Sequence, residues 1–504
     1  MADVLRTHAR SRGDALAFAD GDVALTWHQA DARVNRVAHA LLDSGVQAGD
    51  RVLWLGQNSF RLYELLLACC KIGALFCPAN WRQQPDELAF VIEDLAPAVV
   101  VWQEEEVGAT VAEGRARTAH DARWIQHDTG EYEAWVAEQP DAIGDPNRDA
   151  SHDDPLLLIF TAAFDGRPNA AMLSSRALIA QGLLMAPWSG IDAEYVFLNS
   201  GPLFHIGTFM PNLSTFVMGG ANVFIRRSDG AALCEAIDRF TCTGGFVVGP
   251  MVDAIVEANA GGRYDLSSFR GKRGNREFDA WVQADSSAWG RHAGGYGQSE
   301  VMGMATFDLL GVGGLGTHGR TSPLVDLRIV DADDNEVAAG EVGEIVIRGA
   351  TVMNGYWNRP ELNAHRSRNG WHHTNDLGRF EADGSFSFIG PKTRMLKSAA
   401  ENIYPVEIEN CLKTHPAIAD AAVIGVPDET WVQAVKAIVV VRPGESLTAE
   451  HLIEHCRARI ASYKKPRTVE FVDTIPRQGF AIDYDALDER FGGGNYPGGT
   501  TRSA

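Results

Sequence analysis

The sequence predicts an α/β protein in which helices cover parallel sheets, followed by a smaller α+β domain. Two observations carry this prediction. Apolar residues at helical spacing alternate along the first half of the chain with short β-branched runs, the rhythm typical of a parallel sheet. Beyond about residue 390 this rhythm gives way to a shorter α+β unit. At 504 residues the chain also exceeds what one hydrophobic core usually serves, so more than one domain is expected.

The N-terminal elements follow from these patterns in order. Apolar residues between 34 and 42 share one helical face, and Gly45 ends the pattern. Residues 65–68 indicate a second helix. Apolar or β-branched runs predict strands over 50–55, 98–102 and 156–160. The acidic stretch 103–153 has few apolar repeats and is expected to form peripheral helices and loops.

The second half of the chain shows a different organisation. Alternating segments between 327 and 348, separated by Asp-Gly punctuation, predict antiparallel structure and a β-barrel-like subdomain. The small domain is expected to contain the segment 403–412 and strands over 421–426 and 437–441. We therefore expect a large domain over 1–390, a small mobile domain over 391–491 and a disordered Gly-rich tail over 492–504.

Composition disfavours several classes of partner, metal site and cellular location. A formal net charge of −21 disfavours nucleic acid or an anionic membrane as partner. The seven cysteines show no Cys-x-x-Cys spacing of a zinc site and are expected to be buried thiols in a reducing cytoplasm. The N-terminus lacks the apolar stretch of a signal peptide, and Lys71 interrupts the longest apolar run, so no membrane span is predicted.

Several motifs, colinear from about residue 25 to 487, resemble the superfamily of acyl-CoA synthetases, peptide-synthetase adenylation domains and luciferases. Any one of them alone is weak, but together they are specific. They are Gly295-Tyr296-Gly297-Gln298-Ser299-Glu300, Gly343-Glu344-Ile345-Val346-Ile347-Arg348-Gly349, Gly355-Tyr356-Trp357-Asn358-Arg359-Pro360-Glu361, Asp376-Leu377-Gly378-Arg379 and Glu401-Asn402-Ile403-Tyr404-Pro405-Val406-Glu407-Ile408-Glu409.

The resemblance implies a two-step ligase. A carboxylate attacks ATP to give an acyl-adenylate (acyl-AMP), the small domain rotates, and the thiol of the co-substrate coenzyme A (CoA) displaces AMP. Tyr296 matches the residue that stacks on adenine, and Asp376 the carboxylate that accepts the ribose hydroxyls. A core tyrosine and a solvated turn aspartate are the rival interpretations. The implied acyl-AMP site comprises Gly295, Tyr296, Gly297, Gln298, Ser299 and Asp376.

Two further residues match reactive positions of the family. His205 resembles the residue at the floor of the acyl pocket, although a histidine in an apolar stretch is as often part of a core. Glu300 matches the glutamate that holds Mg²⁺ against ATP phosphates. If ATP is not a substrate, Glu300 is a vestigial ligand, so the need for Mg²⁺ stays open.

The phosphate loop departs from the family pattern. Relatives have Thr-Ser-Gly-Thr-Thr-Gly-x-Pro-Lys-Gly, whose backbone N–H groups cradle phosphates. Asn169 replaces the lysine, and an aspartate enters the cradle, where like charges about 4 Å apart repel by several kcal/mol. The degenerate loop contains Thr161, Ala162, Ala163, Phe164, Asp165, Gly166 and Asn169.

The C-terminal motifs differ as well. Relatives have Pro-Arg-Thr-x-x-Gly-Lys, whose lysine acts during adenylation, whereas no lysine follows Lys465 here. The hinge segment retains Arg394 but lacks the family's aspartate. Ala399 and Ala400 replace two glycines of the loop that lines the thiol channel. Alanine leaves room for a thiol, but a positive φ at either position would cost about 1 kcal/mol.

These departures favour a non-adenylating acyl-CoA ligase that receives acyl-AMP from an adenylating partner enzyme and transfers the acyl group to CoA. One alternative is a conventional ATP-dependent acyl-CoA synthetase, in which Lys464 or Lys465 replaces the missing lysine. A second alternative is a catalytically dead scaffold that binds acyl-AMP. The sequence does not identify the acid, the pathway or the oligomeric state.

Overall fold

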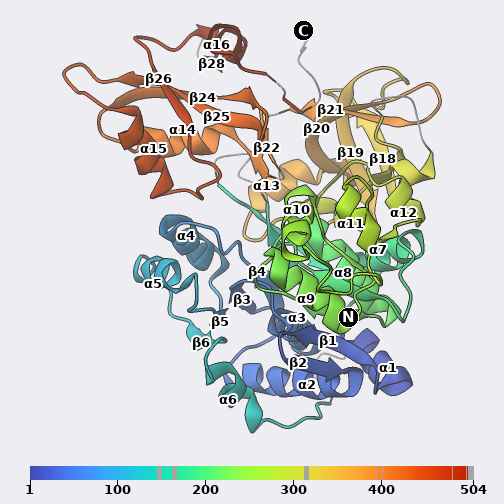
Figure 1. Cartoon of the computed structure of the whole chain (residues 1–504). Coiled ribbons are helices and arrows are strands. Elements are labelled where there is room, and N and C mark those ends of the chain that lie inside the picture. The colour runs from blue at the N-terminus through green and yellow to red at the C-terminus, as the bar shows by residue number, and fades with distance from the viewer. Residues whose placement is uncertain are drawn as a thin grey trace.

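The computed structural model describes residues 1–144, 150–161, 167–311, 317–392, 394–399, 401–478, 481–494 and 496–497. Ala162, Ala163, Phe164, Asp165 and Gly166 of the phosphate loop, and Ala400 of the thiol-channel loop, lie outside these residues. Figure 1 shows a large body formed by the N-terminal elements, with an antiparallel sheet and a small C-terminal unit above it.

A six-stranded sheet forms one half of the large body, in the order β6-β5-β3-β4-β7-β8. All its neighbouring strands are parallel except the β7–β8 pair. The strands are β3 (Arg51–Leu55), β4 (Leu75–Pro78), β5 (Val99–Trp102), β6 (Arg123–Gln126), β7 (Pro155–Phe160) and β8 (Ala170–Ser174). The predicted strands 50–55, 98–102 and 156–160 are confirmed here, whereas β6 falls in the stretch expected to hold no strand.

A five-stranded sheet forms the other half, in the order β11-β9-β10-β1-β2. β1, β10, β9 and β11 are parallel, and β2 pairs antiparallel with β1. The strands are β1 (Leu16–Asp20), β2 (Val23–Thr26), β9 (Val196–Asn199), β10 (Ala221–Phe224) and β11 (Gly244–Gly245). The predicted helix-covered parallel sheets are therefore confirmed.

Helices cover both sheets and join them through one core. Phe18 of one sheet and Trp54 of the other belong to the same buried cluster as Phe216 of α8. The predicted helices at 34–42 and 65–68 lie within α2 and α3. The helices of this body are α1 (Ala2–Arg12), α2 (Trp27–Asp43), α3 (Phe60–Ile72), α4 (Pro85–Leu95), α5 (Gly108–Ala116), α6 (Glu131–Ala137), α7 (Ser175–Trp188), α8 (Ile206–Met218), α9 (Gly230–Phe240), α10 (Gly249–Ala258), α11 (Arg276–Trp281) and α12 (Ala288–Arg291).

A four-stranded antiparallel sheet follows, formed by β18 (Val325–Val330), β19 (Gly343–Gly349), β20 (His372–Phe380) and β21 (Phe386–Pro391). The segment expected to be barrel-like is an open sheet: within the described residues β18 and β21 are its edges and do not pair. The helix α13 (Pro360–Arg366) precedes β20. Short elements lead into the sheet: β14 (Gly297–Gln298), η1 (Ser299–Val301) and β15 (Gly303–Met304).

The small C-terminal unit has its own sheet, in the order β23-β22-β25-β24, with β26 on β25. Helices α14 and α15 pack against it around Leu396, Ile408 and Leu452. Its elements are β22 (Leu396–Ser398), β23 (Glu401–Ile403), α14 (Pro405–Lys413), β24 (Ile418–Asp428), β25 (Val432–Val441), α15 (Ala449–Arg457), β26 (Thr468–Phe471), β27 (Arg477–Gln478), β28 (Ala481–Ile482) and α16 (Tyr484–Phe491). The predicted α+β unit is confirmed.

The start of the Gly-rich tail differs from the disorder expected of it. The Gly494 N–H donates to the Gly425 carbonyl, and the Tyr496 hydroxyl accepts from the Gly425 N–H and donates to Asp488. Gly493, Gly494, Tyr496 and Pro497 are thus half-buried. No helix in the described part of the chain is both long and apolar enough to cross a membrane.

Candidate functional site

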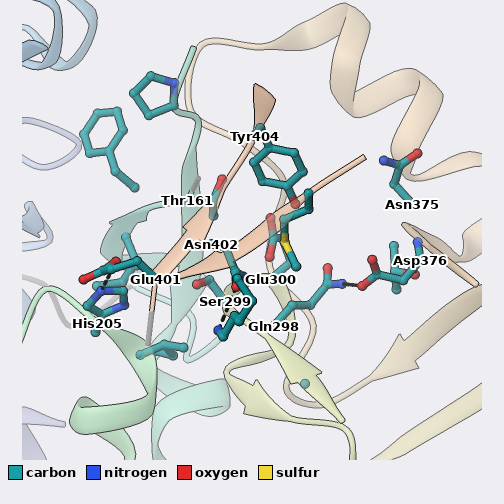
Figure 2. A pocket seen from close by; sticks show the side chains of 18 of the residues that line it. Thr161, His205, Gln298, Ser299, Glu300, Asn375, Asp376, Glu401, Asn402 and Tyr404 are labelled. Carbon is teal, nitrogen blue, oxygen red and sulfur yellow. Dashed lines mark hydrogen bonds and ion pairs between the residues drawn. The ribbon is translucent and has the colours of Figure 1, made fainter. Parts of the chain in front are cut away.

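A cavity of about 680 Å³ lies where the large body, the four-stranded sheet and the small domain meet. Residues far apart in sequence line it, including Thr161, His205, Tyr296, Asp376 and Glu401. In Figure 2 the β22–β23 hairpin of the small domain crosses the cavity, with Glu401 beside His205 at one end and Asp376 at the other. Both domains therefore build the site.

Asp376, on β20, is held by two donors from one motif. The Tyr296 hydroxyl donates to Asp376 Oδ2 over 2.7 Å, and Gln298 Nε2 donates to the same oxygen over 3.2 Å. Figure 2 shows the Gln298 bond as a dashed line. Burial raises the Asp376 pKa to about 7, although the bond from Tyr296 opposes the shift. A ligand that donates hydrogen bonds here would stabilise the ionised carboxylate.

Tyr296 combines a packed ring with a polar tip. Its ring stacks on Phe388 with centroids 5.4 Å apart, and the side chain lines the cavity. The flanking glycines allow the chain to pack closely on itself. A Cβ at Gly297 would lie 1.7 Å from the Gly303 carbonyl oxygen, and one at Gly295 2.1 Å from the Thr306 oxygen. Both glycines also line the cavity, so their role in acyl-AMP binding stays a prediction.

Asn375, which precedes Asp376, adopts a left-handed backbone conformation with φ of 63°. Asparagine tolerates this region better than most residues. The Asn375 N–H donates to Glu344 over 3.2 Å. The turn presents the Asp376 side chain to the cavity.

Glu300 is buried in η1, where it accepts a 2.8 Å hydrogen bond from the Tyr356 hydroxyl. Burial raises the Glu300 pKa. The described residues contain no group of three or more His, Cys, Asp or Glu side chains that could hold a metal ion. Glu300 alone would supply Mg²⁺ with one carboxylate ligand, so the role expected of it stays a prediction.

His205 and Glu401 form a contact between the two domains. His205 Nε2 lies 3.3 Å from Glu401 Oε2, and Arg82 donates to Glu401 Oε1 over 2.6 Å (Figure 2 shows the His205 contact). Burial opposes ionisation of Glu401, but the hydrogen bond from His205 and the positive charge of Arg82 outweigh it and hold its pKa at about 2. Glu401 is therefore a fixed anion at the edge of the cavity.

The β22–β23 hairpin is anchored from β25. Ser398 pairs with Val432, and the Ala399 N–H donates to the Trp431 carbonyl over 2.8 Å. Ala399 has φ of 50°, so this alanine is held in a conformation that favours glycine. Lys397, at the base of the hairpin, donates through Nζ to Asn402 over 2.8 Å. These contacts fix the hairpin, of which Lys397, Glu401 and Asn402 line the cavity, whereas Ala399 is not among the lining residues.

Lys464 forms a second link between the domains. Its ammonium donates to Glu407 over 2.6 Å within the small domain and to Glu87 of α4 over 2.7 Å. Burial alone would lower its pKa, but the charges of Glu87 and Glu407 outweigh burial and raise it well above the usual value. Lys464 thus lines the cavity as a protonated side chain whose charge is balanced by two carboxylates.

Asn169, at the family's lysine position, is 1% exposed. Its amide oxygen accepts from Arg359 Nε over 2.9 Å, and Arg359 also donates to Asp94 over 2.7 Å. The Asn169 carbonyl accepts from both the N–H and the hydroxyl of Thr161. This asparagine therefore joins β8 to the segment before α13.

The segment that aligns with the family's lysine loop lies on another side of the small domain. Arg477 donates to Asp420 over 2.5 Å, and β27 pairs with β28. Neither described strand lines the cavity, whereas the β22–β23 hairpin does. Arg394, the predicted hinge residue, contacts Asp488 of α16.

The structure places the sequence-predicted candidates His205, Thr161, Glu300 and Asp376, together with the whole Gly295–Ser299 motif, around one cavity. Sequence reasoning missed Arg82 and the pairing of Lys464 with Glu87. Arg82 lies 319 residues before Glu401 in the chain, and no local pattern connects them.

The family described as AMP-binding enzyme matches residues 5–357, and the AMP-binding enzyme C-terminal domain matches 407–479. The chain belongs to the AMP-binding enzyme family. A feruloyl-CoA synthase of Amycolatopsis sp is 34% identical over 481 residues, covering 94% of each chain. An indoleacetate–CoA ligase of Aromatoleum aromaticum is 33% identical, covering 92% of each.

Solved structures share the architecture of almost the whole chain. The amide bond synthetase from Marinactinospora thermotolerans superposes with a TM-score of 0.80 at 26% identity, covering 97% of this chain and 99% of the other. The o-succinylbenzoate CoA synthetase from Bacillus subtilis, bound to a product analogue, gives 0.77 at 22% identity, which shows the fold alone. The chain is therefore an AMP-binding enzyme of the acyl-CoA ligase type.

Proposed function

We propose that the protein converts acyl-AMP and CoA to acyl-CoA and AMP. The observation that carries this proposal is the β22–β23 hairpin at the cavity, with Glu401 on His205 and Arg82. In this reaction the CoA sulfur, as thiolate, attacks the acyl carbon and forms the C–S bond. The bond from that carbon to the phosphate oxygen breaks, AMP leaves with its electron pair, and the thiol proton passes to solvent.

The chain's own residues supply binding and orientation for this step. Asp376 accepts the ribose hydroxyls, and Tyr296 offers its ring to adenine. Arg82 fixes Glu401, so the carboxylate keeps its contact with His205. Holding the anhydride carbon and the thiol in one geometry is the main source of rate in such a transfer.

We further propose that ATP-dependent adenylation is lost, so that an adenylating partner enzyme supplies acyl-AMP. Asn169 is engaged with Arg359 where relatives have a cation, and no lysine follows Lys465. Loss of one preorganised cation typically costs on the order of 3 kcal/mol of transition-state stabilisation. Two such losses affect the first half-reaction and leave the Asp376 site intact.

A conventional ATP-dependent acyl-CoA synthetase is the second candidate, and the comparisons favour it. The relatives at 33–34% identity are named as a CoA synthase and a CoA ligase, and they match over nearly their full length. Lys464 lines the cavity, although two carboxylates hold it here. The same relatives suggest an aromatic acid, such as ferulate or indoleacetate, as the acyl donor.

One set of assays separates the candidates. Purified protein receives either synthetic feruloyl-AMP or indoleacetyl-AMP with CoA, or ATP with Mg²⁺, the free acid and CoA, and acyl-CoA is quantified. The proposal expects transfer from acyl-AMP and acid-dependent pyrophosphate exchange near background. Robust exchange would establish the ATP-dependent candidate instead. Binding of acyl-AMP without transfer would indicate a scaffold, and Asp376→Ala serves as the binding-deficient control.

A further inference from the structure

The chain segment after α16 returns to the core of the small domain. Gly494 donates its N–H to the Gly425 carbonyl over 2.9 Å, and its own carbonyl accepts from Gln433 Nε2 over 2.5 Å. Tyr496 packs with the small-domain core, and Pro497 lines the catalytic cavity. We call Gly492–Gly494 with Tyr496–Pro497 the C-terminal strap.

Tyr496 packs against the hinge arginine, Arg394, and bonds to the carboxylate that pairs with it. The Arg394 guanidinium lies 4.0 Å from the centre of the Tyr496 ring and contacts Asp488. The Tyr496 hydroxyl donates to Asp488 over 2.8 Å and accepts from the Gly425 N–H over 2.9 Å. The ring of Tyr484 lies on Arg394 as well, at 4.8 Å. Arg394 is thus enclosed by residues that follow it by 90 or more positions.

Gln433 connects the strap to the hairpin. Its side chain is fully buried, and while Nε2 donates to Gly494, Oε1 accepts from the Lys397 N–H over 2.7 Å. Lys397 belongs to β22, which carries the turn at Ala399. A Cβ at Gly425 would lie 2.5 Å from Gln433 Nε2, so the amide fills its site closely. One side chain therefore couples the strap to the cavity.

We propose that Tyr496 is a positioning residue for the thiol step, acting through Arg394 and Gln433. The strap fixes the hinge arginine, Arg394, within the small domain. Through Gln433 it also fixes the position of β22 in the sheet. Both contacts set where the β22–β23 hairpin meets His205. This inference rests on the proposed acyl transfer for its kinetic readout but not for its structural one.

The test uses the full chain with Tyr496→Leu, which removes the ring and the hydroxyl, and Tyr496→Phe, which removes the hydroxyl bonds alone. Single-turnover transfer from acyl-AMP at varied CoA is measured together with acyl-AMP affinity. We expect about tenfold or greater loss in kcat/KM for CoA with Tyr496→Leu and about threefold loss with Tyr496→Phe. Acyl-AMP affinity, set by the large body, should stay unchanged.

Hydrogen exchange gives the second readout. Amides of 396–403 should exchange faster in Tyr496→Leu, while those of α7 and α8 keep the wild-type rate. Tyr264→Phe, on the large body, is the matched control. Unchanged exchange in 396–403 with unchanged kcat/KM for CoA in folded Tyr496→Leu would overturn the proposal. If the wild type transfers no acyl group, the proposed function fails, and hydrogen exchange still decides the role of the strap.

Discussion

Three non-glycine residues near the cavity occupy the left-handed region of backbone space: Asn375, Ala399 and Val432, with φ of 63°, 50° and 69°. Asparagine tolerates this conformation, whereas alanine and especially a β-branched valine do not favour it. Such strain persists where surrounding contacts determine the backbone. The Ala399 bond to Trp431 and the Ser398–Val432 pair supply those contacts.

Asp376 should make acyl-AMP binding depend on pH. Its folded pKa of about 7 lies above the ordinary value, so its contribution to stability is lost as pH rises from about 4 through 7. Ribose hydroxyls donate to the ionised form, which therefore binds. Acyl-AMP affinity should rise about tenfold between pH 6 and pH 8, because the ionised fraction rises by that factor. Calorimetric titration across this range measures the effect.

The control for this prediction is Asp376→Asn, which keeps the shape of the side chain and removes its ionisation. Its affinity should be weaker by about 1–3 kcal/mol at pH 8 and independent of pH. Equal pH dependence in the wild type and in Asp376→Asn would assign the titration to another group.

Among the secondary-structure elements, the β22–β23 hairpin is the part of the small domain that completes the cavity. Each strand has three residues, too few for stability without β25 and the buried Gln433. Its turn residue Ala399 is strained, so we predict that Ala399→Gly raises the free energy of unfolding by about 1 kcal/mol. Thermal or urea unfolding measures the change.

Ala437→Gly in β25 is the matched substitution for this test. Ala437 is fully buried in a regular strand, so glycine there should lower stability by about 1 kcal/mol. Ala399→Gly should also retain acyl transfer, because it removes one methyl group and leaves the hairpin residues that line the cavity unchanged. A loss of stability at Ala399 would show that the turn does not need a left-handed residue.

The elements differ in how far sequence predicts them. β3, β5 and β7 are continuous apolar runs, so pattern alone located them. β6 (Arg-Trp-Ile-Gln) has one fully buried residue and gave no such signal. Motifs located Asp376 and Tyr296, but the Arg82–Glu401 and Lys464–Glu87 pairs depend on how two domains meet. That arrangement has no local periodicity to reveal it.

At the scale of the whole molecule, a few charged side chains join the two domains. Arg82 lies between the rings of Phe204 and Tyr463 while it binds Glu401. Lys464 reaches Glu87 on α4. These partners are largely buried, so salt should screen them less than it screens surface pairs.

Glu87→Gln tests the Lys464 link. In the wild type the Gln84 N–H donates to Glu87 Oε2. The side-chain amide oxygen of the introduced glutamine can accept the same bond, so the start of α4 is preserved. Loss of the charge should weaken domain closure by about 1–3 kcal/mol, since a charge-assisted bond is replaced by a neutral one. Single-turnover acyl transfer should slow, and acyl-AMP affinity should not change.

Glu113→Gln is the control for that substitution, because Glu113 is exposed and pairs with Arg117 within one helical turn. It should have no measurable effect on transfer. Wild-type transfer rates in Glu87→Gln would mean that Lys464 does not hold the domains together.

The path of the strap also bears on how the protein is made. Both parallel sheets and the four-stranded sheet are complete by Pro391, so a nascent chain can form the Tyr296 and Asp376 platform before the small domain has left the ribosome. The contacts of Arg394 and Gln433 with the strap, however, need residues up to Tyr496. A partly synthesised enzyme would therefore be able to bind an adenylate before it could transfer the acyl group to a thiol.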